Sequence, residues 1–301
     1  MTAAGKGRRL TETPDVNRRT PDNTWVLSRS VFSRRWSLER IKVIVHGAGG
    51  RMGQEVIKAV AGQNDMRLVG AVDAEPTGEY LELPNSIDRV PLSADLAGML
   101  KTTQAKVVVD FSTAGAVLPA VEIAAAHGAC VVTGTTGLNT DVLEKIVKIS
   151  TQKGIGVVYA ANYALGAVLM MHAAKIFAKH LDSAEIIELH HDNKIDAPSG
   201  TALSTAKEML KARGKSFEVD AGAESNFTSR GQNMDGISIH SVRLPGFVAH
   251  QEVIFGGLGQ TLTVRHDTIS RESFMPGVVL AVREVLKRPG LTVGLEALLG
   301  L

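Results

Sequence analysis

The segment RIKVIVHGAGGRMGQEVIKAV, residues 40–60, carries the pattern that decides the fold. A short β-branched apolar run leads into a cluster of glycines, and apolar residues at helical spacing follow, so the segment predicts a strand, a tight turn and a helix. The next apolar run, MRLVGAVD (residues 66–73), ends in Asp73. A turn of this kind places the start of a helix where it can receive a pyrophosphate, and an acid after the second strand can bond ribose hydroxyls.

The glycine spacing departs from the usual G-x-G-x-x-G form. Gly47 and Gly49 occupy the first two positions, but Met52 stands where the third glycine is expected, and Gly53 follows it. The strand before, the helix after and the acid closing the next strand supply the context that this motif requires. We therefore predict a Rossmann-type unit, with an α/β turn whose glycines serve only the backbone as the alternative.

The same alternation of strand and helix continues along the chain. Short apolar runs at residues 105–113, 129–137 and 155–166 are each followed by a helical pattern, which is typical of a doubly wound parallel sheet covered on both faces. Small polar residues follow these runs, at the edge where open α/β sheets bind ligands. They are Ser112, Thr113, Thr135, Thr136 and Asn162. Each could also cap a helix, but together they favour a cofactor cleft.

The pattern changes after residue 166. A helix (167–181), an alternating strand (183–191), a helix (199–214) and a series of alternating strands (237–268) predict a second, α+β domain on a mixed or antiparallel sheet. A final helical stretch at 274–286 can return to the first domain. We therefore predict a dinucleotide-binding domain of residues 41–162 and 270–301, and a substrate-binding and oligomerisation domain of residues 163–269.

Composition excludes several classes of function. The net charge of +2 and the aromatic content of 4% argue against a nucleic-acid partner, and the sequence has no apolar run long enough for a membrane span. Residues 1–40 are rich in arginine and lack hydrophobic periodicity, so we expect a disordered extension outside the fold. The protein is expected in the cytoplasm, with organelle import through this extension as the alternative.

The stretch ELHHDNKIDAPSGTA, residues 188–202, concentrates proton carriers and anion-binding groups. His190 and His191 end a predicted strand, and Lys194 follows in a loop. Ser199, Gly200 and Thr201 open a helix, whose first N–H groups and positive dipole end form a pocket for an anion. Histidine and lysine can donate a proton to a centre that receives hydride, so the stretch indicates reductive chemistry beside a carboxylate-sized pocket.

A purely structural role for this stretch is less well supported. Ser199 as a simple helix cap and the histidines as solvated loop residues would be reasonable for any one residue, but the groups are too dense for such roles to account for all of them. No metal site is predicted, because adjacent histidines without a third ligand at suitable spacing seldom bind a metal. The chain also lacks a G-x-S-x-G nucleophile elbow.

Five motifs resemble those of the 4-hydroxy-tetrahydrodipicolinate reductase (dihydrodipicolinate reductase) family of the diaminopimelate and lysine pathway. They are VHGAGGRMG, VVDFST, TGTTG, AANYALG and, most specifically, ELHHDNKIDAPSGTAL. The resemblance covers about residue 41 to the C-terminus. It implies NAD(P)H-dependent reduction of a small cyclic dicarboxylate by a homotetramer built through the C-terminal sheet.

The resemblance also implies residue roles. His190 would be the catalytic histidine and Lys194 the general acid, while His191, Gly200 and Thr201 would hold the dicarboxylate. The residues implied in cofactor binding are Gly47, Ala48, Gly49, Gly50, Arg51, Met52, Asp73, Gly134, Thr135, Thr136, Ala160, Ala161, Asn162 and Tyr163.

One position departs from the family pattern. Family members that strongly prefer NADPH often carry an arginine after the acid of the second strand, and here this residue is Ala74. We therefore expect NADH to serve at least as well as NADPH, with Arg51 as the nearby cation for a 2′-phosphate. Two alternatives remain: another Rossmann dehydrogenase acting on an amino-acid-derived acid, and an NAD(P)H sensor without turnover, for which His190 and Lys194 would have no use.

Overall fold

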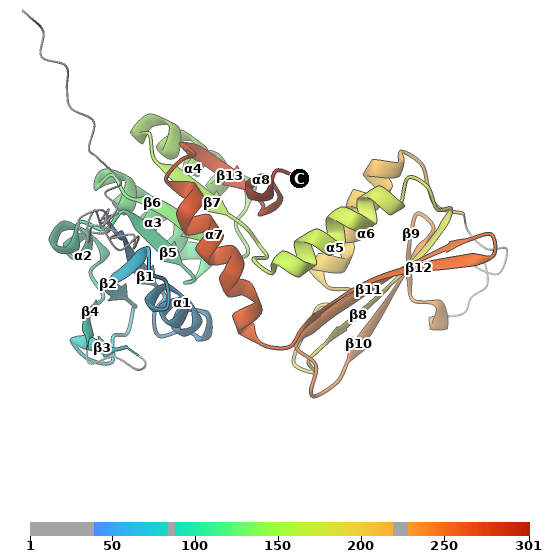
Figure 1. The fold of residues 1–301 in the computed structure, drawn as a ribbon, viewed down its shortest axis with the longest axis horizontal. Helices are drawn as coiled ribbons and strands as arrows, with labels where there is room; N and C mark the ends of the chain where they lie inside the picture. Colours follow the sequence, from blue (N-terminus) through green and yellow to red (C-terminus); the bar gives the residue numbers. More distant parts are fainter. Residues whose placement is uncertain (1–38, 84–87, 219–227) are drawn as a thin grey trace, which may run out of the picture. The chain divides into compact units, whose positions relative to one another are not determined.

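The computed structural model describes residues 39–83, 88–218 and 228–301, so the predicted extension lies outside the described residues except for its last two positions. The described chain forms an eight-stranded sheet and a five-stranded sheet, each with its own helices (Figure 1). This architecture confirms the predicted α/β class with a second, mixed-sheet region.

The eight-stranded sheet has the order β13-β7-β6-β5-β1-β2-β4-β3. All neighbouring pairs are parallel except β3 with β4. The strands are β1 (Ile41–His46), β2 (Met66–Val72), β3 (Tyr80–Glu82), β4 (Arg89–Ser93), β5 (Val107–Asp110), β6 (Cys130–Thr133), β7 (Gly156–Tyr159) and β13 (Gly290–Val293).

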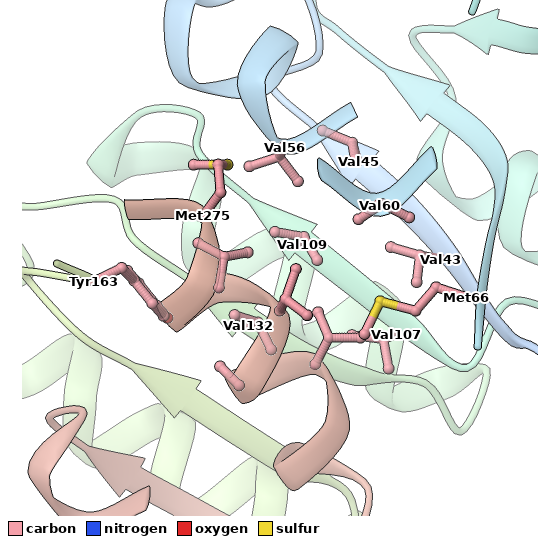
Figure 2. Packing of buried hydrophobic residues seen from close by; sticks show 14 of the residues in the cluster. Val43, Val45, Val56, Val60, Met66, Val107, Val109, Val132, Tyr163 and Met275 are labelled. Carbon is pink, nitrogen blue, oxygen red and sulfur yellow. The ribbon is translucent and has the colours of Figure 1, made fainter. Parts of the chain in front are cut away.

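Helices cover both faces of this sheet because its strands are apolar on both sides. Val43 and Val45 of β1 pack with α1 (Arg51–Ala61) and α7 (Met275–Val285), in the core that Figure 2 shows. Ile44, between them, points to the other face, where α2 (Leu96–Thr103), α3 (Ala114–Ala126) and α4 (Thr140–Lys153) pack. Continuous valine runs buried on both faces are typical of parallel sheets, and the predicted doubly wound sheet is confirmed.

The five-stranded sheet has the order β12-β11-β8-β10-β9. Only β8 and β10 pair in parallel, so the sheet is mixed. Its strands are β8 (Ser183–His190), β9 (Gln232–Met234), β10 (Ile237–Arg243), β11 (Ala249–Gly257) and β12 (Gln260–Thr268). The helices α5 (Leu165–Phe177) and α6 (Gly200–Arg213) pack side by side on the face that carries Ile186, Val253 and Phe255 (Figure 1).

Several elements were not predicted from the sequence. They are β3, β4, α2, β9, β13, α8 (Glu296–Leu299) and the two 3₁₀ turns η2 (Thr228–Arg230) and η3 (Arg271–Phe274). Most are of three to five residues, too short for a hydrophobic period to be recognised. In addition, β6 and β7 end at Thr133 and Tyr159, so the polar residues that follow them lie in loops at the ligand-binding edge.

Candidate active site

The glycine turn after β1 lies where the strand order changes direction, because β2 pairs on one side of β1 and β5 on the other. Gly47 adopts a φ of +79°, and a Cβ there would come within 2.5 Å of the carbonyl oxygen of Phe111. A Cβ at Gly53 would lie 2.0 Å from the carbonyl oxygen of Gly47. Both positions therefore require glycine, the first for its conformation and the second for close packing of α1 on the turn.

The start of α1 suits an anion. Its N-cap, Gly50, provides no capping side chain, and the first turn contains no acidic residue. The first N–H groups of a helix have no partner within it, and they carry the positive end of its dipole. Asp73 accepts a hydrogen bond at 2.7 Å from the N–H of Gly49, so this acid also holds the turn, a role that the sequence did not reveal.

A buried carboxylate organises the ends of the neighbouring strands. Asp110 is fully buried and accepts hydrogen bonds from His46 (2.7 Å), Ser112 (2.6 Å), Thr133 (2.7 Å) and Thr135 (2.9 Å). Burial alone would raise the pKa of Asp110, but the hydrogen bonds from His46, Ser112 and Thr133 outweigh it and hold that pKa below its ordinary value. Asp110 therefore links β1, β5 and β6 as an ionised acceptor.

A cavity of about 280 Å³ opens beside this cluster. It brings together four residues that the sequence assigned to the cofactor, together with two of the polar residues after β5. These are Met52, Gly134, Thr135, Thr136, Ser112 and Thr113. Gly134 is confined by Phe111, since a Cβ there would lie 2.1 Å from the phenyl ring.

Other residues assigned to the cofactor lie elsewhere. Ala48, Ala160 and Tyr163 are buried, and the hydroxyl of Tyr163 donates to the carbonyl of Thr133 at 2.9 Å. Burial raises the pKa of Tyr163 far above its ordinary value, so its hydroxyl remains protonated. The side chain of Tyr163 thus belongs to the core, and contact with a cofactor would have to come from the backbone.

A second cavity, of about 190 Å³, contains His190 and Thr201. Ala161 and Asn162, both assigned to the cofactor, also line it, together with Gln251 and His266. Burial lowers the pKa of His266, which favours its neutral form. The structure therefore brings the predicted catalytic histidine, one predicted substrate ligand and two predicted cofactor residues to one cavity.

The ring of His190 is held by a fully buried acid. The Nδ1 atom of His190 lies 2.5 Å from Oε2 of Glu188, and Arg243 donates to both oxygens of Glu188, at 2.9 and 2.7 Å. Burial alone would raise the pKa of Glu188, but hydrogen bonds from His190 and Arg243 lower it to about 2. Because an ionised carboxylate only accepts, Nδ1 of His190 must carry a proton, which leaves Nε2 for chemistry.

The three residues predicted to bind an anion at the start of α6 have different roles in the structure. Ser199 is buried; its hydroxyl accepts from the N–H of Ala202 at 3.2 Å, and its own N–H donates to Glu188 at 3.1 Å. Ser199 is therefore a helix cap, the structural role that its residue type also allowed. Gly200 is exposed and Thr201 half-buried, so their N–H groups remain for an anion.

Lys194 and His191 lie in the loop between β8 and α6. The ammonium of Lys194 donates to both oxygens of Asp196, at 2.7 and 2.8 Å, and this contact lowers the pKa of Asp196. The N–H of Lys194 donates to the carbonyl of His191 at 3.2 Å, which tightens the loop. His191 is half-buried.

Sequence reasoning missed Asp110, Glu188 and Arg243 as parts of the site. A signal existed for the two acids, because Asp110 follows three valines in β5, and Glu188 shares the inward positions of β8 with Ala184 and Ile186. No such signal existed for Arg243, which reaches the site only through the pairing of β10 with β8.

The described ranges lack the features of two other classes of protein. Within residues 39–83, 88–218 and 228–301, no group of three or more His, Cys, Asp or Glu side chains is arranged to hold a metal ion. In the same ranges, none of the helices combines the length and apolar character that crossing a membrane requires.

Comparison with known protein families gives two matches that together cover most of the chain. Residues 41–163 match the model described as dihydrodipicolinate reductase, N-terminus, and residues 166–299 match the model described as dihydrodipicolinate reductase, C-terminus.

Individual relatives agree with these matches. The chain is 51% identical over 261 residues to a 4-hydroxy-tetrahydrodipicolinate reductase of Dehalococcoides mccartyi, covering 87% of this chain and 99% of that protein. It is 45% identical over 271 residues to that of Desulfitobacterium hafniense, covering 86% and 98%. Among solved structures, a dipicolinate-bound dihydrodipicolinate reductase from Paenisporosarcina sp. TG-14 matches with a TM-score of 0.77 and 37% identity over 86% of this chain and 99% of that one.

Proposed function

The chain belongs to the dihydrodipicolinate reductase family, and from that premise we propose how its residues share the reaction. The protein is an NAD(P)H-dependent oxidoreductase that reduces 4-hydroxy-tetrahydrodipicolinate to tetrahydrodipicolinate in the diaminopimelate route to lysine. The nicotinamide would supply a hydride when bound, and the 4-hydroxyl group leaves as water, so the protein must hold the substrate and deliver one proton.

We assign the proton chemistry to His190 and Lys194. The observation that carries this assignment is the position of His190, whose free Nε2 belongs to the cavity that also contains Thr201 at the start of α6. Lys194 is the general acid, because its ammonium group, which contacts Asp196, is a proton donor on the loop that follows His190. His190 sits beside the reacting ring and steadies the charge that develops there.

The dicarboxylate is held at the start of α6. The N–H groups of Gly200 and Thr201 and the helix dipole bind one carboxylate, and His191 contacts the substrate from the loop. Ser199 contributes indirectly, since its hydroxyl caps α6 and its N–H bonds Glu188. The bound dipicolinate in the Paenisporosarcina relative is a planar dicarboxylate, which supports a ligand of this shape here.

The cofactor is assigned to the first sheet. The turn from Gly47 to Met52 and the N-terminus of α1 fit a pyrophosphate, because they combine glycine conformation with uncapped N–H groups. The cavity lined by Gly134, Thr135 and Thr136 fits the next part of the dinucleotide. Asp73, followed by Ala74, fits an unphosphorylated ribose, and we therefore propose that NADH serves at least as well as NADPH.

We propose a cytoplasmic homotetramer assembled through the five-stranded sheet. Because α5 and α6 cover the face that carries Ile186 and Val253, the opposite face presents the half-buried side chains of Ile187, Leu189 and Ile254. We also retain the division into a dinucleotide-binding domain (41–162 and 270–301) and a substrate and oligomerisation domain (163–269).

Replacement of Lys194 by alanine tests the assignment. We expect kcat to fall by about 10²- to 10⁴-fold with little change in NADH affinity measured by fluorescence, because a general acid acts in the chemical step. Lys175→Ala is the matched control, since this lysine also pairs with an acid, Glu208, but on α5. An unchanged kcat in Lys194→Ala would remove Lys194 from the mechanism.

An inhibitor tests the proposed carboxylate pocket at the start of α6. Pyridine-2,6-dicarboxylate should compete with substrate, whereas inhibition that is competitive against NADH alone would contradict this pocket.

A further inference from the structure

Three parts of the proposed active site converge on one ion pair. Glu188 touches the ring of His190, the N–H of Ser199 and the guanidinium of Arg243. Arg243 also donates to the carbonyl oxygens of Lys194 (3.3 Å) and Asp196 (2.6 Å). Nothing in the proton chemistry or the carboxylate binding described above uses Glu188 or Arg243 directly.

We propose that Glu188 and Arg243 are positioning residues. They fix the tautomer of His190 and hold the loop that carries Lys194 in a fixed position relative to His190. This inference rests on the proposed roles of His190 and Lys194. The pair touches the reaction only through those residues and through the start of α6.

The hydrogen-bond count supports the first half of this inference. Each oxygen of Glu188 accepts two donors: Oε2 takes His190 Nδ1 and one Arg243 nitrogen, and Oε1 takes the Ser199 N–H and the other Arg243 nitrogen. Since no donor capacity exists on this carboxylate, the imidazole has one permitted orientation and one permitted Nδ1 protonation state. The Nε2 atom is then the only ring nitrogen available to the cavity.

The shape of Arg243 supports the second half. A guanidinium has five donors in a rigid plane, and here it bonds the carboxylate as a fork while it spans two carbonyls of the loop. The side chain of Arg243 is only 18% exposed, so water weakens these bonds little. A lysine could replace the positive charge of Arg243 but not its planar pair of hydrogen bonds to the two oxygens of Glu188.

A similar arrangement elsewhere provides a matched control. Arg213, at the last position of α6, donates to the carbonyls of Ala178 (3.0 Å) and Leu181 (2.7 Å) and to Asp182 (2.6 Å). It has the same chemistry as Arg243, but the carboxylate of Asp182 is 60% exposed and touches no residue of the proposed site.

The test combines kinetics with histidine spectroscopy. In Glu188→Gln, the amide oxygen should take the Oε1 position, where the Ser199 N–H and Arg243 can only donate, and the amide nitrogen should then face His190. Because that nitrogen cannot accept, we expect the ring of His190 to lose its fixed Nδ1–H tautomer and kcat to fall by about 10²-fold or more, with NADH affinity unchanged. Solid-state NMR of ¹⁵N-histidine protein reports the tautomer; the signals of His190, one of nine histidines, are identified by their loss in His190→Gln. Asp182→Asn should leave both readouts unchanged.

A second variant separates the two halves. Arg243→Lys should keep the His190 tautomer but lower kcat by about tenfold, because the loop of Lys194 loses its fork. If Glu188→Gln does not fold, the ¹⁵N spectrum of the wild-type protein tests the first half, because any tautomer of His190 other than Nδ1–H overturns it, and Arg243→Lys tests the second half.

The outcomes distinguish this inference from the proposed function. A wild-type tautomer in Glu188→Gln, or a changed tautomer with wild-type kcat, overturns the positioning role of Glu188. Wild-type kcat in Arg243→Lys overturns the proposal that Arg243 positions the loop of Lys194. Wild-type kcat in His190→Gln and Lys194→Ala instead overturns the proposed function, while the NMR result still reports on the tautomer.

Discussion

Each sheet carries one fully buried carboxylate beside a histidine at the carboxyl end of a strand: Asp110 is the last residue of β5, and Glu188 lies two residues before the end of β8. The two are compensated differently. Glu188 receives a guanidinium fork, an imidazole and a backbone N–H, whereas Asp110 receives three hydroxyls and an imidazole.

The difference between the donors matches the two proposed tasks. A guanidinium is permanently charged and planar, so it fixes both oxygens of Glu188 and thereby the direction of the His190 ring. Hydroxyl groups rotate to suit their partners, so the Asp110 cluster can join three strand ends without fixing a proton position. The first arrangement suits a site of proton transfer, and the second suits a platform for a cofactor.

The largest expected effect comes from removing the guanidinium. Arg243→Met leaves Glu188 buried with two donors fewer, and we expect the free energy of unfolding to fall by about 3–5 kcal/mol in urea titrations. The double variant Glu188→Leu/Arg243→Met should recover much of this loss, because no buried charge then remains without its partner. A loss below about 1 kcal/mol in the single variant would show that the Glu188 ion pair is not a strong buried contact.

Acid should weaken both clusters, and Glu188 provides the clearer window. Because folding lowers the pKa of Glu188 from 4.5 to about 2, its contribution is fully present above the ordinary carboxyl range and is lost as the pH falls from about 5 to 2. The pKa of Asp110 is also lowered, with the same sign. Urea titrations at pH 6, 5, 4 and 3 should show a flatter decline for Glu188→Gln than for wild type; parallel curves would contradict the assigned shift.

A smaller effect is expected at Asp110, where no permanent cation is left behind. Asp110→Asn keeps the shape but loses the charge, and rotating hydroxyls can partly adapt, so we expect a stability loss of about 1–3 kcal/mol and NADH affinity reduced by about tenfold. Turnover at saturating NADH should change little. Asp65→Asn, at a half-exposed pair with Arg283, is the control, with a loss below about 1 kcal/mol. A large fall in kcat at saturating NADH would remove the functional contrast between the two acids.

The sequence was sufficient to predict the strands and helices around Asp110 and Glu188, but not the different donors that these two acids receive. The glycine turn, the parallel strands and the helix that begins at residues 199–201 depend on local patterns, which one-dimensional analysis can recognise. Arg243 and Glu188 are 55 residues apart, and they meet because Arg243 pairs with His190 in the register of β10 and β8. His46 and Asp110, 64 residues apart, meet through the register of β1 and β5. Strand register over such distances leaves no local signal.

The smallest expected effect concerns a third acid, Asp73, which is half-buried rather than buried. Its Oδ2 accepts the N–H of Gly49, so the carboxylate is fixed at the end of β2, where it can accept from ribose hydroxyls and repel a 2′-phosphate. Ala74 supplies no compensating charge, and Arg51, at the first position of α1, is a cation that directly follows the glycine turn.

We therefore expect NADH to be at least as good as NADPH, and Arg51→Ala to lower kcat/KM for NADPH more than for NADH, because a guanidinium binds a phosphate well and an unphosphorylated ribose offers it no charge. Lys58→Ala, two turns further along α1 and paired with Glu55, is the control and should leave the ratio unchanged. A wild-type preference for NADPH above about tenfold, or about 1.4 kcal/mol, would contradict the role given to Asp73. In that case Asp73 would contribute less to the choice between NADH and NADPH than its contact with the turn suggests. The reason would be that solvent screens the charge of this half-exposed acid, whereas it cannot screen the buried charges of Asp110 and Glu188.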